Sequence, residues 1–146
     1  MFNQSQDDRL SSWIQLRKEA EVSENPLKIV AEFWSAAPFV PYNRDIDPFN
    51  QFAWPTPWEI IVNNKYDDFT KALMIAWTLK LTDKFKKSQI EIKMFTDTAT
   101  DKGLTYNLVI IDDVWVLNYQ DNEVFEVKNL PESFRLENLI QVDRPR

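Results

Sequence analysis

Apolar positions are densest in residues 64–84, NKYDDFTKALMIAWTLKLTDK. The centre of this segment is apolar on nearly every side of a helix: Leu73, Met74, Ile75, Ala76, Trp77 and Leu79. A helix that is apolar all round has to be buried all round. The segment contains no Gly or Pro, and Asn64 as N-cap with Asp67 and Asp68 in the first turn supply start signals. We therefore predict a buried central helix over residues 64–84.

Two helices are predicted before it. Leu10, Trp13, Ile14 and Arg17 fall on one face of a helix over about residues 7–21, with Arg17, Lys18 and Glu19 turned outward. An N-cap followed by Pro at the first helical position, Asn25-Pro26, opens a second helix that Pro38 ends. Its buried stripe is Leu27, Val30, Phe33 and Trp34. Both helices are expected to cover the core.

A capping box, Thr56-Pro57-Trp58-Glu59, predicts a short helix that leads into the central helix. Beyond residue 88 the period changes to alternation, which is typical of strands. Strands are expected over residues 90–95, 104–111 and 114–119, with a further short strand near 124–127. The last two long strands form a hairpin around Asp112-Asp113, and the polar connection 96–103 contains the only Gly of the chain. Residues 131–138 are interpreted as a helical turn.

Helices first and strands afterwards predict an α+β fold, with N-terminal helices and a buried central helix packed on a C-terminal antiparallel sheet of three to four strands. The length favours a single domain, residues 1–146. Within it we distinguish two covering helices (7–37), a Pro- and aromatic-rich loop (38–57), the short and central helices (58–87), the antiparallel strands (88–127) and a C-terminal segment (128–146).

The loop 38–57 is the most unusual stretch, because five of its residues are Pro and several are aromatic. Loops of this length inside a compact domain are usually functional or packed down by their own side chains. Packing over the central helix is the favoured interpretation. Aromatic anchors on a stiffened backbone are also typical of binding hot spots. The partner-binding candidates are Phe39, Tyr42, Phe49, Phe52 and Trp54.

Composition removes several function classes. The net charge is −6, which argues against nucleic acid as the main partner, because affinity for a duplex comes largely from Lys and Arg. The chain has neither Cys nor His, so the commonest nucleophile, general base and zinc ligands are missing. No signal peptide or membrane-spanning run is recognised, and we expect synthesis in the cytoplasm. From these absences we predict that the protein is not an enzyme. A Ser-Lys or carboxylate mechanism stays open.

Neither a catalytic, a cofactor-binding nor a metal-binding residue is assigned. The carboxylates that could serve such roles are Asp45, Asp47, Asp112, Asp113 and Asp121. Asp45 and Asp47 lack the third ligand, the Gly and the closing Glu of a calcium loop, so a solvated turn is the better interpretation. A basic cluster, Lys80, Lys84, Lys86 and Lys87, is expected to complement the C-terminus of the central helix rather than to bind phosphate.

From the central helix onward, the layout resembles the transglutaminase-like division of the papain fold. The resemblance lies in the helix from Tyr66, the strand LTYNLVII, the turn Asp112-Asp113 and the segment VWVLNY with Trp115. It implies a helix that begins at a nucleophilic Cys, a strand that begins at a catalytic His, and a third catalytic Asp or Asn. Here the helix start offers Tyr66, Asp67 or Asp68, and the strand start offers Leu104, Thr105 or Tyr106. Asn118 fits the third role, so the resemblance implies a catalytically silent version.

A second likeness is carried by WPTPWEII followed by DDFTKALMIAWTLKLTD, which is similar to small uncharacterised proteins of T4-like, especially marine, tailed phages. It implies a virion structural or interaction component, made in the host cytoplasm and then carried in the particle. The expected partners are other phage proteins, including copies of the chain itself, with no nucleic acid and no membrane. The alternatives are a host-directed acidic accessory or inhibitor protein that binds a host protein, and a transglutaminase-like or carboxylate-based enzyme.

Overall fold

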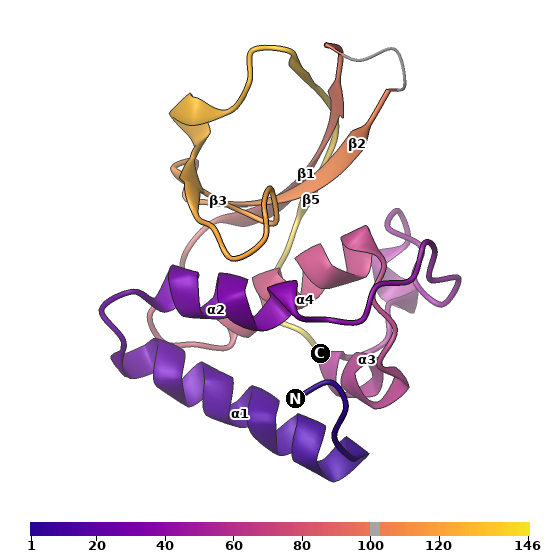
Figure 1. Ribbon diagram of the computed structural model, residues 1–146, viewed down its shortest axis with the longest axis vertical. Helices are drawn as coiled ribbons and strands as arrows, with labels where there is room; N and C mark the ends of the chain where they lie inside the picture. Colours follow the sequence, from indigo (N-terminus) through magenta and orange to yellow (C-terminus); the bar gives the residue numbers. More distant parts are fainter. Residues whose placement is uncertain (100–102) are drawn as a thin grey trace.

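The computed structural model describes residues 1–99 and 103–146, and in this part of the chain four α-helices precede an antiparallel sheet of five strands (Figure 1). The helices are α1 (Gln6–Val22), α2 (Pro26–Ser35), α3 (Pro57–Asn63) and α4 (Asp68–Lys80). The strands are β1 (Ile90–Asp97), β2 (Thr105–Ile111), β3 (Trp115–Leu117), β4 (Phe125–Glu126) and β5 (Phe134–Gln141), with short 3-10 turns at Gln51–Ala53 and Val127–Asn129. The predicted α+β fold is confirmed.

The sheet has the order β4-β3-β2-β1-β5, so the last strand returns to lie beside the first. The prediction of three to four strands is wrong, because residues 131–138 contribute most of β5 and not a helical turn. The register between β1 and β5 shifts at Met94 and Phe95, which marks a β-bulge. A bulge adds a residue to one strand and breaks the alternation by which a strand is recognised in a sequence.

Helix α4 lies between the sheet and the other helices, and every residue from Phe69 to Lys80 except Lys71 is buried (Figure 1). The predicted all-round burial is therefore confirmed. The start of the helix is not at Asn64, because Asn64 ends α3 in the left-handed conformation with φ 56°. Asp67 is the N-cap instead, and its carboxylate accepts a hydrogen bond from the backbone N–H of Thr70.

Helices α1 and α2 cover α4 on the side away from the sheet. The buried face of α1 consists of Arg9, Trp13, Leu16 and Ala20, whereas Ile14, which was expected on this face, is exposed. The indole N–H groups of Trp13 and Trp34 both donate to Thr78 Oγ1, at 2.9 and 3.1 Å. These two bonds tie α1 and α2 to the last turn of α4. Arg17 lies over the Trp13 ring, with its guanidinium carbon 4.4 Å from the ring centroid.

The opposite face of the sheet is covered by the chain itself, because the segment from Asn118 to Phe134 arches back over it (Figure 1). A second apolar cluster forms there, around the buried side chains of Leu108, Ile110 and Val116. Tyr106 and Phe134 stack in this cluster with ring centroids 4.9 Å apart. The central strands are therefore buried on both faces.

The loop between α2 and α3 does not bury most of its aromatic side chains. Phe39, Tyr42, Phe49 and Phe52 are 69%, 74%, 68% and 93% exposed, so the interpretation of the loop as packing is wrong for these four residues. Trp54 is only 5% exposed and packs against Phe69 and Trp77 of α4. Of the five partner-binding candidates, Trp54 therefore belongs to the core. In the described residues, the helices are too short or too polar to cross a membrane.

Candidate functional site

The N-terminus of α4 is held by Asp67. One carboxylate oxygen of Asp67 accepts from the backbone N–H and the hydroxyl of Thr70, at 2.8 and 2.5 Å. The other oxygen accepts from the backbone N–H of Asn43 at 3.0 Å. Asp67 therefore joins the loop before α3 to the first turn of α4, and its side chain is committed to this structural role. The next residue, Asp68, is the first residue of the helix and lies half-buried against β2, the central strand of the sheet.

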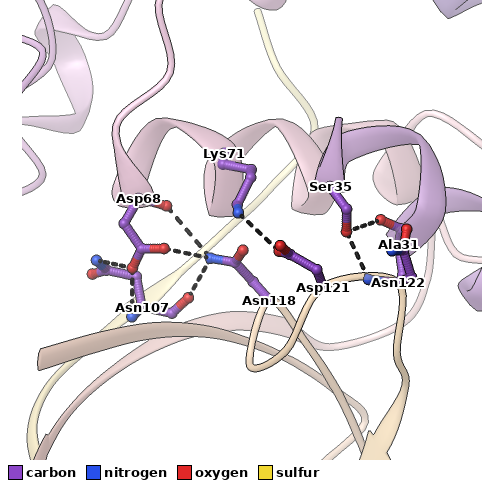
Figure 2. Close-up of polar contacts among 8 residues, drawn as sticks. All are labelled: Ala31, Ser35, Asp68, Lys71, Asn107, Asn118, Asp121 and Asn122. Atoms are coloured by element: carbon purple, nitrogen blue, oxygen red, sulfur yellow. Dashed lines mark hydrogen bonds and ion pairs between the residues drawn. The ribbon is translucent and has the colours of Figure 1, made fainter. Parts of the chain in front are cut away.

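Asp68, Asn107 and Asn118 form a hydrogen-bonded group, here called the Asp68 cluster (Figure 2). Asp68 Oδ2 accepts from the backbone N–H and the side-chain amide of Asn107, at 3.1 and 2.9 Å. Asn118 Nδ2 lies 3.3 Å from Asp68 Oδ1 and 2.9 Å from the backbone oxygen of Asn107. Helix α4, strand β2 and the end of β3 each supply one member. The cluster orients the Asp68 carboxylate at a helix N-terminus, where a negative charge is favoured.

The segment after β3 is fixed against both α4 and α2. Asn118 begins it in the left-handed conformation, with φ 66°. Asp121 lies 3.8 Å from the ammonium group of Lys71, and the backbone N–H of Asn122 donates to Ser35 Oγ at 2.8 Å (Figure 2). Lys28 also donates to the backbone oxygen of Asn122. The wall that carries Asn118 is therefore tied to three separate points of the helical layer.

These elements enclose an open cleft of about 500 Å³, the Asp68 cleft. Aromatic and apolar walls are contributed by Phe39, Pro41, Phe69, Tyr106 and Tyr119. Its charged lining consists of Asp67, Asp68, Asp121 and Lys71, which gives a formal excess of negative charge. The cleft can accept an extended polar chain with cationic groups, because such a ligand would be complementary in charge.

The family resemblance implied three catalytic positions, and only two of them are occupied by members of the Asp68 cluster. Asp68 is the helix-start residue that reaches the cluster, whereas Tyr66 is buried, and burial raises the pKa of its phenol. Among these strand residues, the one that hydrogen-bonds to Asp68 is Asn107, two residues into β2, and not Leu104, Thr105 or Tyr106. Asn118 lies where the third residue was expected. Asn107 could have been found from its pattern, since it shares its sheet face with Val109 and Ile111, and a polar side chain is unusual on that apolar face.

The other candidate carboxylates lie outside the cluster. Asp47 accepts from the backbone N–H of Phe49 at 3.0 Å, and Asp112 accepts from that of Gln89 at 2.9 Å, as solvated turns do. In residues 1–99 and 103–146, no group of three or more Asp or Glu residues could hold a metal ion. The basic cluster acts at the end of α4, where Lys80 donates to the backbone oxygens of Lys86 and Ser88. The connection 96–103 includes residues 100–102, which lie outside the described residues.

No protein-family model and no curated protein matches the sequence. Among solved structures, Legionella pneumophila LapG superposes with a TM-score of 0.70 at 14% identity, over 93% of this chain and 77% of that one. Its calcium-bound form superposes with a TM-score of 0.66 at 15% identity, over 95% of this chain and 81% of that one. These neighbours have the transglutaminase-like or papain-like fold of cysteine proteases, so the fold resemblance is confirmed.

This comparison corrects one prediction. The conclusion from composition that the protein is not an enzyme is wrong, because its structural neighbours have the fold of a protease class. The absence of Cys and His removes one catalytic pair and leaves other chemistry open. At such low identity the likeness describes the fold alone, and the phage origin stays a prediction.

Proposed function

We propose that this protein binds an extended polypeptide segment of a partner in the Asp68 cleft. The observation that carries the proposal is the Asp68 cluster, in which two Asn side chains hold one carboxylate in place at the floor of an open cleft. A site whose polar groups are already oriented loses little entropy when it binds a ligand. The exposed ring of Phe39 at the rim offers an apolar contact beside these polar groups.

The lining of the cleft favours a basic partner segment. Three carboxylates face one ammonium group there, and Lys71 is already close to Asp121. An Arg or Lys side chain of the partner could pair with Asp68 and lie against Phe39 or Tyr106, because cations are attracted to aromatic faces. Association should therefore weaken as salt screens the charges.

The setting that we propose is a tailed-phage particle, in which the partner is another particle component. The support is the sequence likeness to T4-like phage proteins and the exposed aromatic residues of the loop before α3. The alternative is a host-directed protein whose acidic cleft occupies a basic host surface. The two settings differ in location, because only a particle component remains with the purified particle.

The first experiment is cross-linking mass spectrometry on purified particles of the source. A particle component should be present in fixed copy number, with cross-links to one partner from the exposed Lys65, two residues before Asp67 of the cleft. Lys18, on the exposed side of α1, is the matched control and should give fewer links to that partner. Absence from particles, together with salt-sensitive capture of a host protein, would favour the host-directed alternative.

A second experiment tests the cleft directly. Phe39→Ala should weaken the interaction with the identified partner at least tenfold, because it removes an apolar contact at the rim and leaves the charge of the cleft unchanged. Val22→Ala shortens an even more exposed apolar residue at the end of α1 and should leave affinity unchanged. Equal affinities for both variants and the wild type would place the interaction elsewhere on the surface.

A second candidate function is hydrolysis of the bound segment. It is favoured by the position of Asp68, whose carboxylate is at the first residue of α4, where the family's nucleophile begins the helix. Asp68 would accept a proton from a water molecule as its oxygen adds to the peptide carbonyl, and would return that proton to the amine nitrogen as the C–N bond breaks. Incubation with the partner and mass spectrometry of the products tests this role. Asp68→Asn should then abolish cleavage, and an unchanged product pattern would exclude Asp68 as the base.

A further inference from the structure

The loop before α3 presents two aromatic side chains on a rigid support. Phe49 and Phe52 are largely exposed, and we call them the Phe52 knob. Their backbone is fixed from three sides. Trp54 Nε1 donates to the backbone oxygen of Asp47 at 2.7 Å, Asp47 accepts from the N–H of Phe49, and Arg146 donates to the backbone oxygen of Phe52 at 3.2 Å. An aromatic group held out into solvent on an ordered turn is a common feature of interaction sites.

A hollow of about 590 Å³ lies between the start of α2, the connection from α4 to β1, and β3. Its apolar walls are Pro26, Leu27, Phe85, Trp115 and Val124, and we call it the Trp115 hollow. Trp115 is 40% exposed and belongs to neither apolar cluster of the fold. The hollow therefore offers an indole face and aliphatic walls to an incoming apolar side chain.

The knob and the hollow are on opposite sides of the molecule. In Figure 1 the loop between α2 and α3 lies at the right, whereas the turn between α1 and α2, the connection after α4 and β3 lie at the left. A knob cannot reach the hollow of its own chain across this width. It can reach the hollow of a second copy in a head-to-tail arrangement.

The two surfaces are also complementary in charge. The hollow is lined by Glu24 and Glu123 against Lys28, and Lys28 already pairs with Glu32 and Glu123. The pocket beside the knob is lined by Arg144 and Arg146 against Asp143. One surface therefore carries an excess negative charge and the other an excess positive charge. Such complementarity favours association of unlike faces and disfavours association of like faces.

We propose that copies of this chain assemble head to tail, with the Phe52 knob of one copy seated in the Trp115 hollow of the next. The contact is heterologous, so it generates a ring where the rotation between copies closes and a filament where it does not. This assembly uses surfaces separate from the Asp68 cleft and does not depend on the function proposed for that cleft.

The test uses two variants that each remove one side of the contact. The double variant Phe49→Asp/Phe52→Asp removes the knob and keeps the hollow, whereas Trp115→Asp disrupts the hollow and keeps the knob. Light scattering over a concentration series should show mass growth for the wild type and only monomer for each variant alone. An equimolar mixture of the two should form a dimer and nothing larger, because each variant retains one half of the contact.

Controls separate this result from misfolding and from the cleft. Circular dichroism should show native helix content and cooperative unfolding in both variants. Phe39→Asp should assemble like the wild type, since Phe39 lines the cleft and not the knob. Glu24→Arg and Arg144→Glu should each weaken assembly. Their equimolar mixture should assemble in alternation, because the unaltered faces of the two variants fit each other and their altered faces are again opposite in charge. A wild type that stays monomeric at all concentrations, or a mixture that stays monomeric while the wild type assembles, overturns the proposal.

Discussion

The hydroxyl of Thr78 accepts the indole N–H of Trp13 at 2.9 Å, although the two residues are 65 positions apart in the sequence. The same oxygen accepts from Trp34, and the hydroxyl donates to the backbone oxygen of Met74. All three side chains are fully buried. One hydroxyl group therefore satisfies the polar atoms of two core tryptophans and fixes how α1 and α2 lie on α4.

Thr78→Val should be strongly destabilising although it preserves shape. It leaves two buried indole N–H groups without an acceptor, and each orphaned donor costs about 1–3 kcal/mol. We expect the free energy of unfolding in urea to fall by about 2–4 kcal/mol. Thr78→Ser keeps the hydroxyl and should lose only about 1 kcal/mol for the missing methyl group. Similar losses in both variants would mean that the hydrogen bonds contribute little.

Asn118 should contribute to the stability of the fold in two separable ways. Its side chain donates to Asp68 and to the backbone of Asn107, and its backbone is in the left-handed conformation. Asn118→Ala loses both the hydrogen bonds and the conformational tolerance, and should cost about 2–3 kcal/mol. Asn118→Gly keeps the backbone conformation available and should cost less by about 1 kcal/mol. Denaturant unfolding of both variants measures the difference, and equal losses would assign the whole effect to the side chain.

Tyr66 should make stability fall at alkaline pH. Burial raises the pKa of its phenol in the folded state above the ordinary value of 10.0. The unfolded chain therefore releases this proton first, so stability is fully present below pH 10 and is lost as the pH rises above it. Tyr66→Phe should remove this part of the pH dependence. Unfolding free energies between pH 8 and pH 11 would show it, and an unchanged slope in the variant would assign the dependence to other groups.

The same substitution should not destabilise the protein at neutral pH. The hydroxyl of Tyr66 is buried and has no hydrogen-bond partner among the described residues. Its removal should therefore raise the free energy of unfolding by about 1 kcal/mol. Tyr106→Phe, at a partly exposed tyrosine of the second cluster, is the matched control and should change stability little. A loss in Tyr66→Phe would indicate a partner for the hydroxyl.

The hairpin turn offers a stabilising change. Asp112 and Asp113 have φ angles of 53° and 56°, a conformation that suits Asn-Gly or Asp-Gly turns. Asp113→Gly should raise the free energy of unfolding by about 0.5–1 kcal/mol. Glycine adopts the left-handed conformation without steric strain, and this gain exceeds the entropic cost of a more flexible unfolded chain. Asp113→Ala, which loses the pairing with Lys93 without that relief, should be destabilising. Thermal unfolding of the two variants should move in opposite directions.

Much of the fold follows from local patterns in the sequence. The all-round apolar centre of α4, the capped start of α3 at Thr56 and the hairpin at Asp112-Asp113 all depend on neighbouring residues, and each is present. The start of α4 was misplaced because Asn64 and Asp67 are both good N-caps. Only tertiary structure decides that Asn64 takes the left-handed position at the end of α3. Strand β5 was missed because its bulge breaks the alternation on which strand prediction depends.

The candidate site was less accessible to prediction than the fold. Asp68 and Asn118 were named as positions because a family layout suggested them, but their contact joins residues 50 positions apart. Asn107 was missed because the expected position was the start of the strand. Which residue of β2 lies beside Asp68 depends on how β2 is placed along α4, and the sequence does not show this placement. The exposure of Phe49 and Phe52 depends on how the loop is tied by Arg146. No local pattern carries that information.

The position of β5 beside β1 has a consequence for how the chain folds during synthesis. Strand β1 can pair with β2 early, but its other edge stays open until residues 134–141 have left the ribosome. That edge carries Ile90 and Ile92, and an unpaired apolar edge strand is a template for association between chains. A nascent chain stalled before Phe134 would therefore be the aggregation-prone species.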